Sequence, residues 1–188
     1  MNPYKRFIFW FFTLNVLFSI LVSVLLWLYD PFMFFHKPYF REWTYPSDRR
    51  LAAKGMVDFV EFDSAIFGSS MLENTLSNEA DKIGGKWLNL AINSSRIYER
   101  EDLIQYLLKR KQIKQIVYAL ENYFLVNGDS SKANEKADFK PLNLNLSFEQ
   151  NFKIYLDSHF IKCALKWSKK KECVGRDLNT FADWYSQN

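Results

Sequence analysis

The sequence predicts an α/β domain, with a small parallel sheet and flanking helices, that follows one N-terminal membrane-spanning helix. Two observations carry this prediction. A long uncharged run lies within the first 29 residues, and the chain after position 47 alternates short apolar segments with amphipathic helical ones. Strands that alternate with helices of about 10 to 15 residues are typical of right-handed βαβ units with parallel strands. A chain of 188 residues has room for one such domain beside the anchor.

The membrane-spanning helix is predicted over residues 7–29, which read FIFWFFTLNVLFSILVSVLLWLY and contain no charge. A helix of this length measures roughly 34 Å, enough to cross the hydrocarbon core of a bilayer. Lys5 and Arg6 precede the run and Asp30 follows it, which predicts a cytoplasmic tail over residues 1–6. We therefore expect a single-pass protein of the inner (cytoplasmic) membrane with a periplasmic body. A cleaved signal peptide is the alternative, although no Ala-x-Ala-like site ends the run.

Residues 30–47 are expected to be a juxtamembrane linker, because they are rich in proline and aromatic residues. Their rings are expected either at the outer headgroup layer or against the body. Residues 48–188 are assigned to the extracytoplasmic α/β domain. Within it, apolar periodicity predicts helices over 48–60, 71–83, 98–111 and 148–167, and strands over 63–68, 86–92 and 113–120.

Composition argues against several classes of function. The net charge is +4 and the basic residues form no dense stripe, so a nucleic-acid partner is not expected. No Gly-x-Gly-x-x-Gly or phosphate-loop spacing occurs, and no cofactor is expected. Cys163 and Cys173 lack a matched histidine cluster, so no metal site is predicted. A disulfide between them and two free thiols are both ordinary outcomes. Solvated helix faces are expected for the acidic residues Glu73, Asp81, Glu99, Glu101 and Asp102.

Candidate chemistry is concentrated in residues 63–70, which read DSAIFGSS. Gly-Ser-Ser directly follows a predicted strand and precedes a predicted helix. This order places a hydroxyl at the carboxyl edge of a parallel sheet, where ligands bind in open α/β folds. A serine there can act as a nucleophile, and nearby backbone N–H groups can stabilise an oxyanion. The same tripeptide also serves as an ordinary turn and helix N-cap.

Three short motifs follow the anchor in order: Asp-x-x-x-x-Gly-Ser-Ser at 63–70, Trp-Leu-Asn-Leu-Ala at 87–91, and Ile-Val-Tyr-Ala-Leu-Glu-Asn-Tyr-Phe at 116–124. This arrangement resembles the SGNH (GDSL-like) hydrolase superfamily. It looks most like the membrane-anchored branch that includes the D-alanyl transfer protein of lipoteichoic acid synthesis and the alginate O-acetylation proteins. The resemblance covers residues 48–165 and implies an SGNH or flavodoxin-like sheet. Three predicted strands are few for that architecture, so an incomplete or truncated domain is expected.

The resemblance places the Gly-Asp-Ser motif of the family on Gly68-Ser69-Ser70. It implies that Ser70 is the catalytic nucleophile and that Ser69 replaces the usual aspartate. The block that supplies an oxyanion-hole glycine falls on residues 89–95, with Ala91 and Ser94 where glycine is usual. The asparagine block falls on Asn122, in a Leu-Glu-Asn context. The implied oxyanion or substrate-binding residues are Ser69, Ala91, Asn93 and Asn122.

The family also carries an Asp-x-x-His near its C-terminus, because a serine hydroxyl needs an adjacent base. This chain has two histidines. His36 lies beside the anchor, and His159 follows Asp157 by two residues within a predicted helix, where positions two apart do not share a face. We expect a structural role for His159.

Two hypotheses about function follow. In the first, the chain handles acyl esters on cell-envelope glycans, by O-acyl transfer or as an esterase, through Ser70. The implied partners are the lipid bilayer, a membrane-bound O-acyltransferase and an envelope polysaccharide. In the second, the chain is a catalytically inactive or truncated membrane-tethered binding or accessory module of the same fold. The missing Asp-x-x-His favours the second hypothesis.

Overall fold

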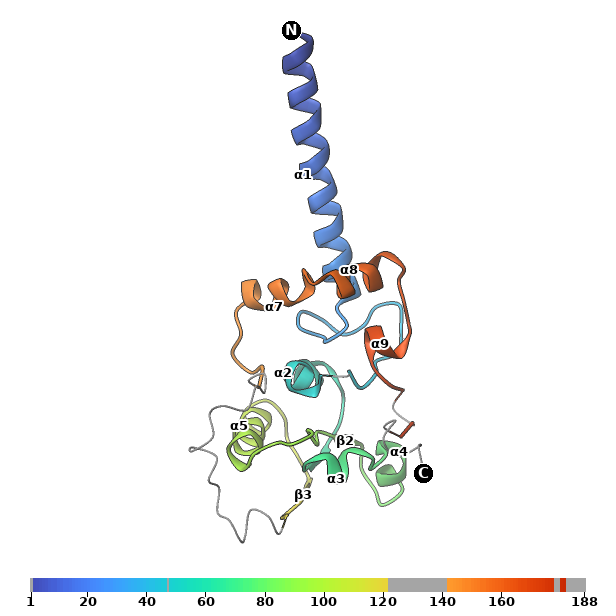
Figure 1. Ribbon diagram of the computed structural model, residues 1–188. Coiled ribbons are helices and arrows are strands. Elements are labelled where there is room, and N and C mark those ends of the chain that lie inside the picture. Colours follow the sequence, from blue (N-terminus) through green and yellow to red (C-terminus); the bar gives the residue numbers. More distant parts are fainter. Residues whose placement is uncertain (1, 47, 122–141, 178–179, 182–188) are drawn as a thin grey trace.

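The structure is a computed structural model that describes residues 2–46, 48–121, 142–177 and 180–181. Helix α1 (Pro3–Tyr29) projects as a single rod from a body that contains all other described elements (Figure 1). In chain order, the body contains α2 (Arg49–Phe59), β1 (Ser64–Phe67), α3 (Ser70–Glu73), α4 (Ser77–Asp81), β2 (Trp87–Asn89), α5 (Ile97–Leu108), β3 (Gln115–Tyr118), α7 (Phe148–Tyr155), α8 (Ser158–Leu165) and α9 (Lys171–Val174).

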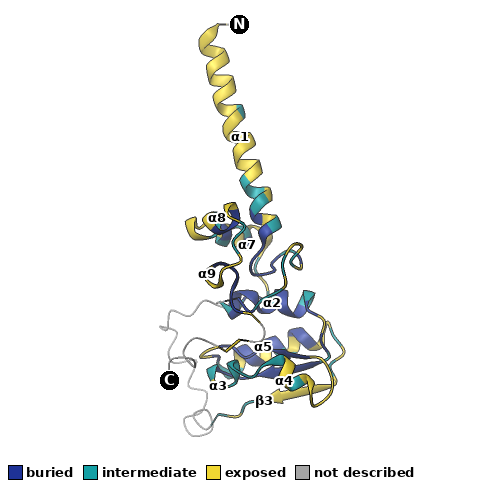
Figure 2. Ribbon diagram, turned by 90° about the vertical axis from the view of Figure 1, so that its right-hand side faces the viewer, coloured by how far each residue is buried: buried dark blue, intermediate teal, exposed yellow. Residues whose placement is uncertain are grey.

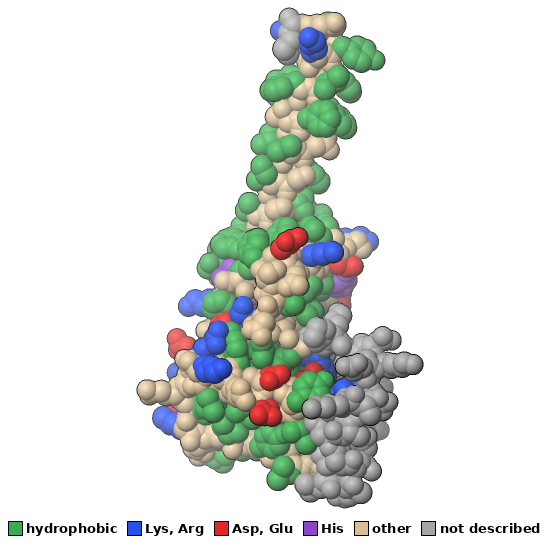
Figure 3. Space-filling view, turned by 90° about the vertical axis from the view of Figure 1, so that its left-hand side faces the viewer, with side chains coloured by type: hydrophobic (Ala, Val, Ile, Leu, Met, Phe, Trp, Pro, Cys, Tyr) green, Lys and Arg blue, Asp and Glu red, His purple; other side chains and the backbone are tan. Residues whose placement is uncertain are grey.

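Helix α1 is, within the described part of the chain, the one helix long and apolar enough to cross a membrane. Figure 3 shows apolar side chains along its length and basic ones at its free end. Three of its polar side chains form hydrogen bonds within the helix. The side chains of Asn15, Ser19 and Ser23 each donate to the carbonyl four residues earlier, at 2.7 to 2.8 Å. Such internal bonds remove the cost of placing these groups in hydrocarbon.

The three strands form a parallel sheet in the order β2-β1-β3, which confirms the predicted α/β class. Ser64 at the start of β1 pairs with Trp87 of β2 and with Gln115 of β3. All four residues of β1 are buried, as a central strand requires. The side chain of Asp63 fixes the amino ends of the strands, because it accepts the N–H of Lys86 at 2.8 Å and the Lys114 ammonium at 2.7 Å. These bonds, led by that from Lys114, lower the pKa of Asp63 to about 2.

The hydrophobic core is continuous from the last turn of α1 to α9. Helix α2 is buried along most of its length and lies between the sheet and the layer of α7, α8 and α9 (Figures 1 and 2). Close packing here depends on Gly55, since a Cβ at this position would lie 2.1 Å from the carbonyl oxygen of Met33. Because most residues of α2 are buried, the helix is an interior element of the body.

Several residues of the segment 30–46 pack against the body. Phe32, Met33 and Phe34 are buried, and the rings of Phe32 and Phe34 stack on Tyr155 of α7. Of the two placements expected for the rings of this segment, Phe32 and Phe34 therefore take the one against the body, whereas Tyr39 and Phe40 are exposed.

Two predicted helices are each divided in two. The helix expected over 71–83 is broken between α3 and α4. There the buried side-chain amide of Asn89 donates hydrogen bonds to the carbonyls of Leu72 and Thr75, at 2.8 and 2.7 Å. The helix expected over 148–167 is broken between α7 and α8. There Asp157 caps α8 by accepting the N–H of His159 at 2.7 Å.

Candidate functional site

The Gly-Ser-Ser segment lies at the carboxyl end of the central strand, the edge at which open parallel sheets bind ligands. Ser69 is the buried N-cap of α3, and its hydroxyl accepts the N–H of Met71 at 3.3 Å. Ser70 is the first residue of α3 and is partly exposed. Among the described residues, the Ser70 hydroxyl has no hydrogen-bond partner. The segment thus contains the helix cap expected as one of two alternatives, at Ser69, and a hydroxyl at Ser70 that is not engaged within the described residues.

Gly68 brings the ends of neighbouring strands together. A Cβ at this position would lie 3.1 Å from the Cβ of Ala119, which follows β3. The Gly68 carbonyl accepts the N–H of Ile92 at 2.9 Å and the hydroxyl of Ser95 at 3.0 Å. The end of β1 is therefore fastened to the loop after β2.

A buried arginine on α5 links the Ser69 turn to the end of β3. Arg100 donates to Glu121 Oε2 at 2.9 Å, to Ser95 Oγ at 2.8 Å and to the Ala119 carbonyl at 3.0 Å. The other oxygen of Glu121 accepts the N–H of Ser69 at 3.1 Å. Burial raises the pKa of Glu121, but the bonds from Ser69 and Arg100 outweigh it and hold that pKa below its ordinary value. Glu121 is therefore a carboxylate that organises the turn.

Asn89, at the end of β2, closes the other side of the turn. Its side chain is fully buried, and its Oδ1 accepts the N–H of Ala91 at 2.9 Å. An oxyanion hole needs N–H groups that point at the substrate. Since the N–H groups of Ala91 and Ser69 both have acceptors inside the protein, neither is free for the role that the family resemblance implied.

Two arginines at the start of α2 hold the loop after β2. Arg49 donates to the Ala91 carbonyl at 2.8 Å and lies 3.4 Å from Glu73. Arg50 donates to Glu99 at 2.8 Å and to the Asn93 carbonyl at 3.0 Å. Burial lowers the pKa of Arg49 to about 10, although the charge of Glu73 opposes this shift.

The solvated positions expected for Glu73 and Glu99 are thus wrong, because both carboxylates form ion pairs with arginines of α2 that are largely shielded from water. The sequence contained one indication that a charged side chain would be buried. Arg100 precedes the buried Leu103 and Leu107 by three and seven residues, so it shares their helix face. The sequence around Glu73 and Glu99 gives no comparable indication that these carboxylates pair with arginines of α2.

The structure brings four of the five candidate residues to adjoining strand ends. Ser69 and Ser70 follow β1, and Ala91 and Asn93 follow β2, its hydrogen-bonded neighbour. Asn93 is exposed, and its side-chain oxygen accepts the Ser94 hydroxyl at 3.0 Å. Asn122 lies outside the described residues.

Neither histidine of the chain lies near Ser70. Both ring nitrogens of His36 are 2.7 Å from backbone carbonyls, those of Lys37 and Trp27, at the base of α1. His159 lies on α8, at the end of the body next to α1, whereas α3 lies at the opposite end (Figures 1 and 2). The general base that a serine nucleophile requires is therefore not supplied by a histidine of this chain in this structure.

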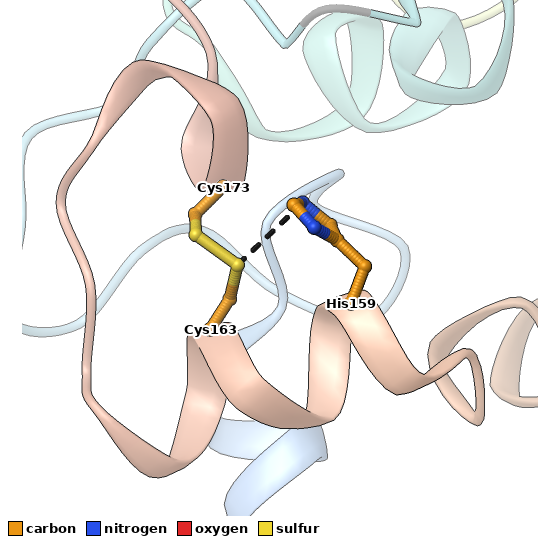
Figure 4. Close-up of side chains that lie close together, drawn as sticks. All are labelled: His159, Cys163 and Cys173. Carbon is orange, nitrogen blue, oxygen red and sulfur yellow. Dashed lines mark hydrogen bonds between the residues drawn. A yellow bond between two sulfur atoms is a disulfide. The ribbon is translucent and has the colours of Figure 1, made fainter.

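Cys163 and Cys173 form a disulfide that joins α8 to α9, one of the two outcomes left open by the sequence. The Nε2 atom of His159 lies 3.6 Å from Cys163 Sγ and 2.8 Å from the Glu172 carbonyl (Figure 4). The ligand atoms of these three side chains lie within 4.8 Å of one another. Metal sites use cysteine as the thiolate, and both sulfur atoms here are bonded to each other.

The fold and the strand-end residues together define a class: an α/β domain with a small parallel sheet, a serine-bearing sheet edge and one apolar N-terminal helix. No family model, curated protein or solved structure matches the chain.

Proposed function

We propose that this chain is a membrane-tethered accessory module of the cell envelope that binds a partner without carrying out acyl chemistry by itself. One observation carries the proposal. At the sheet edge, the N–H groups of Ser69 and Ala91 are engaged within the protein, and the Ser70 hydroxyl has no basic partner among the described residues. Without an adjacent base, a serine hydroxyl is a weak nucleophile. By the family resemblance, the partner would be a membrane-bound O-acyltransferase or an envelope polysaccharide.

The edge of the sheet at β3 supports a binding role. In the described part of the chain, β3 pairs only with β1, and its other edge has no strand partner. Its apolar residues are exposed, with Val117 at 44% and Ile116 at 39%. An open apolar edge favours pairing with another strand, which is a common mode of partner recognition.

The basic residues before the apolar run and the disulfide both support a periplasmic body. Lys5 and Arg6 lie in the first turns of α1, just before its uncharged run, which favours a cytoplasmic N-terminus. A disulfide is typical of an oxidising compartment. We therefore expect a cysteine introduced by Ile83→Cys, at an exposed position of the body, to react with a membrane-impermeant maleimide in spheroplasts. The control Asn2→Cys should react only after lysis. The reverse labelling pattern would contradict a periplasmic body.

Acyl-ester chemistry at Ser70 is the second candidate. It is favoured by the position of Ser70, which begins α3 at the carboxyl end of the central strand with a partly exposed, unengaged hydroxyl. In that case the general base would come from a partner, and the oxyanion donors would have to be released from Glu121 and Asn89.

A fluorophosphonate probe separates the two candidates, because it reacts with activated serines. For an accessory module, we expect no labelling of the full chain, either in detergent or in membranes that contain its native partners. Ser70→Ala should then match the wild type in any cellular assay. Labelling that the Ser70→Ala change abolishes, in either setting, would reject the accessory role and establish Ser70 as a nucleophile. A membrane esterase of known reactivity serves as the positive control.

A further inference from the structure

The junction between α1 and the body is held by one buried carboxylate. Asp30, which caps α1 in the left-handed region and is 0% exposed, accepts the N–H groups of Phe34, Phe35 and His36 at 2.8, 2.9 and 3.1 Å. It also accepts the hydroxyl of Tyr155 on α7 at 2.5 Å. Four donors on one buried acceptor fix the direction in which the chain leaves α1. The junction is therefore stiff, and the body has a defined orientation relative to α1.

The depth of the body relative to a bilayer follows from the length of α1. A hydrocarbon core of about 30 Å takes roughly 20 residues of helix. Counted from Phe7, the first residue after the basic tail, such a span ends at Leu26. Leu26 is only 1% exposed, because α1 is already packed within the body there. If α1 spans the bilayer, the surface of the body beside α1 must lie in the headgroup layer.

Helices α7 and α8 form that surface. They run across the base of α1 in Figure 1 and lie next to its end in Figure 2, and α8 is in direct contact with α1. The Tyr29 hydroxyl at the end of α1 donates to the Ser168 carbonyl just after α8, at 2.5 Å. The buried faces of the two helices, with Tyr155 and Cys163 among them, pack on the body. Their other faces point outward.

The outward faces combine apolar and basic side chains. Leu156, just after α7, and Leu165, on α8, are 52% and 59% exposed. An exposed lysine precedes each by three residues, Lys153 before Leu156 and Lys162 before Leu165. Residues 148–174 contain six lysines and three acidic residues. Exposed leucines beside lysines are typical of helices that lie in a membrane interface and favour anionic lipids.

We propose that α7 and α8 are a membrane-surface platform, which rests on the headgroups of an anionic bilayer and holds the body in one orientation. This inference rests on the anchoring of α1 in the bilayer, which is part of the proposed function. Its consequence concerns the serine-bearing edge. Since α3 lies at the end of the body away from α1, the platform holds Ser70 away from the lipid surface (Figures 1 and 2). A ligand for that edge would arrive from the envelope space and not from within the bilayer.

The test uses the full chain in lipid nanodiscs. A nitrobenzoxadiazole fluorophore is attached through Leu165→Cys on the platform or, as the matched control, through Ile83→Cys on the turn between α4 and β2. Ile83 is 72% exposed. Labelling without reductant keeps the native disulfide intact. In discs that contain phosphatidylglycerol and a headgroup-nitroxide phosphatidylcholine, we expect at least threefold stronger quenching at position 165 than at position 83.

The charge of the platform is tested in the same discs with Lys162→Glu combined with Lys166→Glu, which should reduce the quenching ratio toward one. Equal quenching at the two positions in discs that carry the protein would overturn the platform while leaving the anchor intact. A ratio unaffected by the charge reversal and by replacement of phosphatidylglycerol with phosphatidylcholine would overturn the preference for anionic lipid. If the protein elutes separately from the nanodiscs, the membrane anchoring of α1 is wrong, and the platform is wrong with it.

Discussion

Arg100→Ala is expected to lower the free energy of unfolding by about 3 to 5 kcal/mol, the range found when one partner of a buried ion pair is removed. The Arg100 guanidinium is buried and donates to the side chains of Ser95 and Glu121 and to the carbonyl of Ala119. Its loss leaves the Glu121 carboxylate without its cation and frees the loop after β2 from the end of β3. Chemical denaturation in a non-ionic detergent, followed by circular dichroism, measures the change.

The pH dependence of stability gives a second readout for the same variant. Because the pKa of Glu121 is lower in the folded protein than its ordinary value of 4.5, its carboxylate stabilises the fold above that pH. This contribution is lost as the pH falls below 4.5 and the carboxylate is protonated. Arg100 is one of the groups that lower the pKa, so Arg100→Ala should lose less stability over this acid range than the wild type.

The control for Arg100→Ala is Lys109→Ala, at an exposed position just after the same helix. It should change the free energy of unfolding by no more than about 0.5 kcal/mol, as surface substitutions usually do. A loss below about 1 kcal/mol for Arg100→Ala, the size of an ordinary hydrogen bond, would show that the arginine does not hold the strand ends together.

Asp30→Ala is expected to be similarly damaging, with a loss of about 3 to 5 kcal/mol, because it leaves several buried donors without an acceptor. The substitution also places alanine in a left-handed conformation, with φ of 30°. Asp30→Asn keeps one acceptor oxygen and a residue that tolerates this conformation, so a smaller loss is expected. Tyr155→Phe removes only one of the four donors and should fall between the wild type and Asp30→Ala.

Hydrogen exchange gives the sharper measurement for Asp30. The backbone N–H groups of residues 34–36 are bonded to the Asp30 carboxylate, so Asp30→Ala should accelerate their exchange specifically. Glu42→Ala, at an exposed position in the same segment, is the control and should leave their protection unchanged. Unchanged protection in Asp30→Ala would mean that the carboxylate does not hold the junction.

The alternation of strands and helices could be predicted from the order of apolar and polar residues within each segment. Helix α1 and the buried strand 64–67 follow from continuous apolar runs, and the helix 97–108 follows from apolar periodicity. Each signal lies within one segment, so the type and order of these elements were predicted with small differences at the ends. The Gly-Ser-Ser turn was placed correctly for the same reason, since a glycine and a capping serine act on the residues beside them.

The breaks within helices depended on distant residues. Nothing between positions 71 and 83 indicates that the side-chain amide of Asn89 will donate hydrogen bonds to the carbonyls of Leu72 and Thr75. The aromatic segment after α1 likewise offered two placements, and its packing on Tyr155 is decided by a residue more than a hundred positions later.

By itself, the sequence determined the apolar N-terminal helix, the α/β class, and the position of Ser70 directly after a buried strand, because each depends on neighbours along the chain. Only the tertiary structure decided that the N–H groups of Ser69 and Ala91 are engaged, that both histidines lie far from Ser70, and that Asp30 clamps α1 to α7. These features depend on which side chains meet across the core, and a buried charge or amide takes whichever partner the packing brings within hydrogen-bond distance.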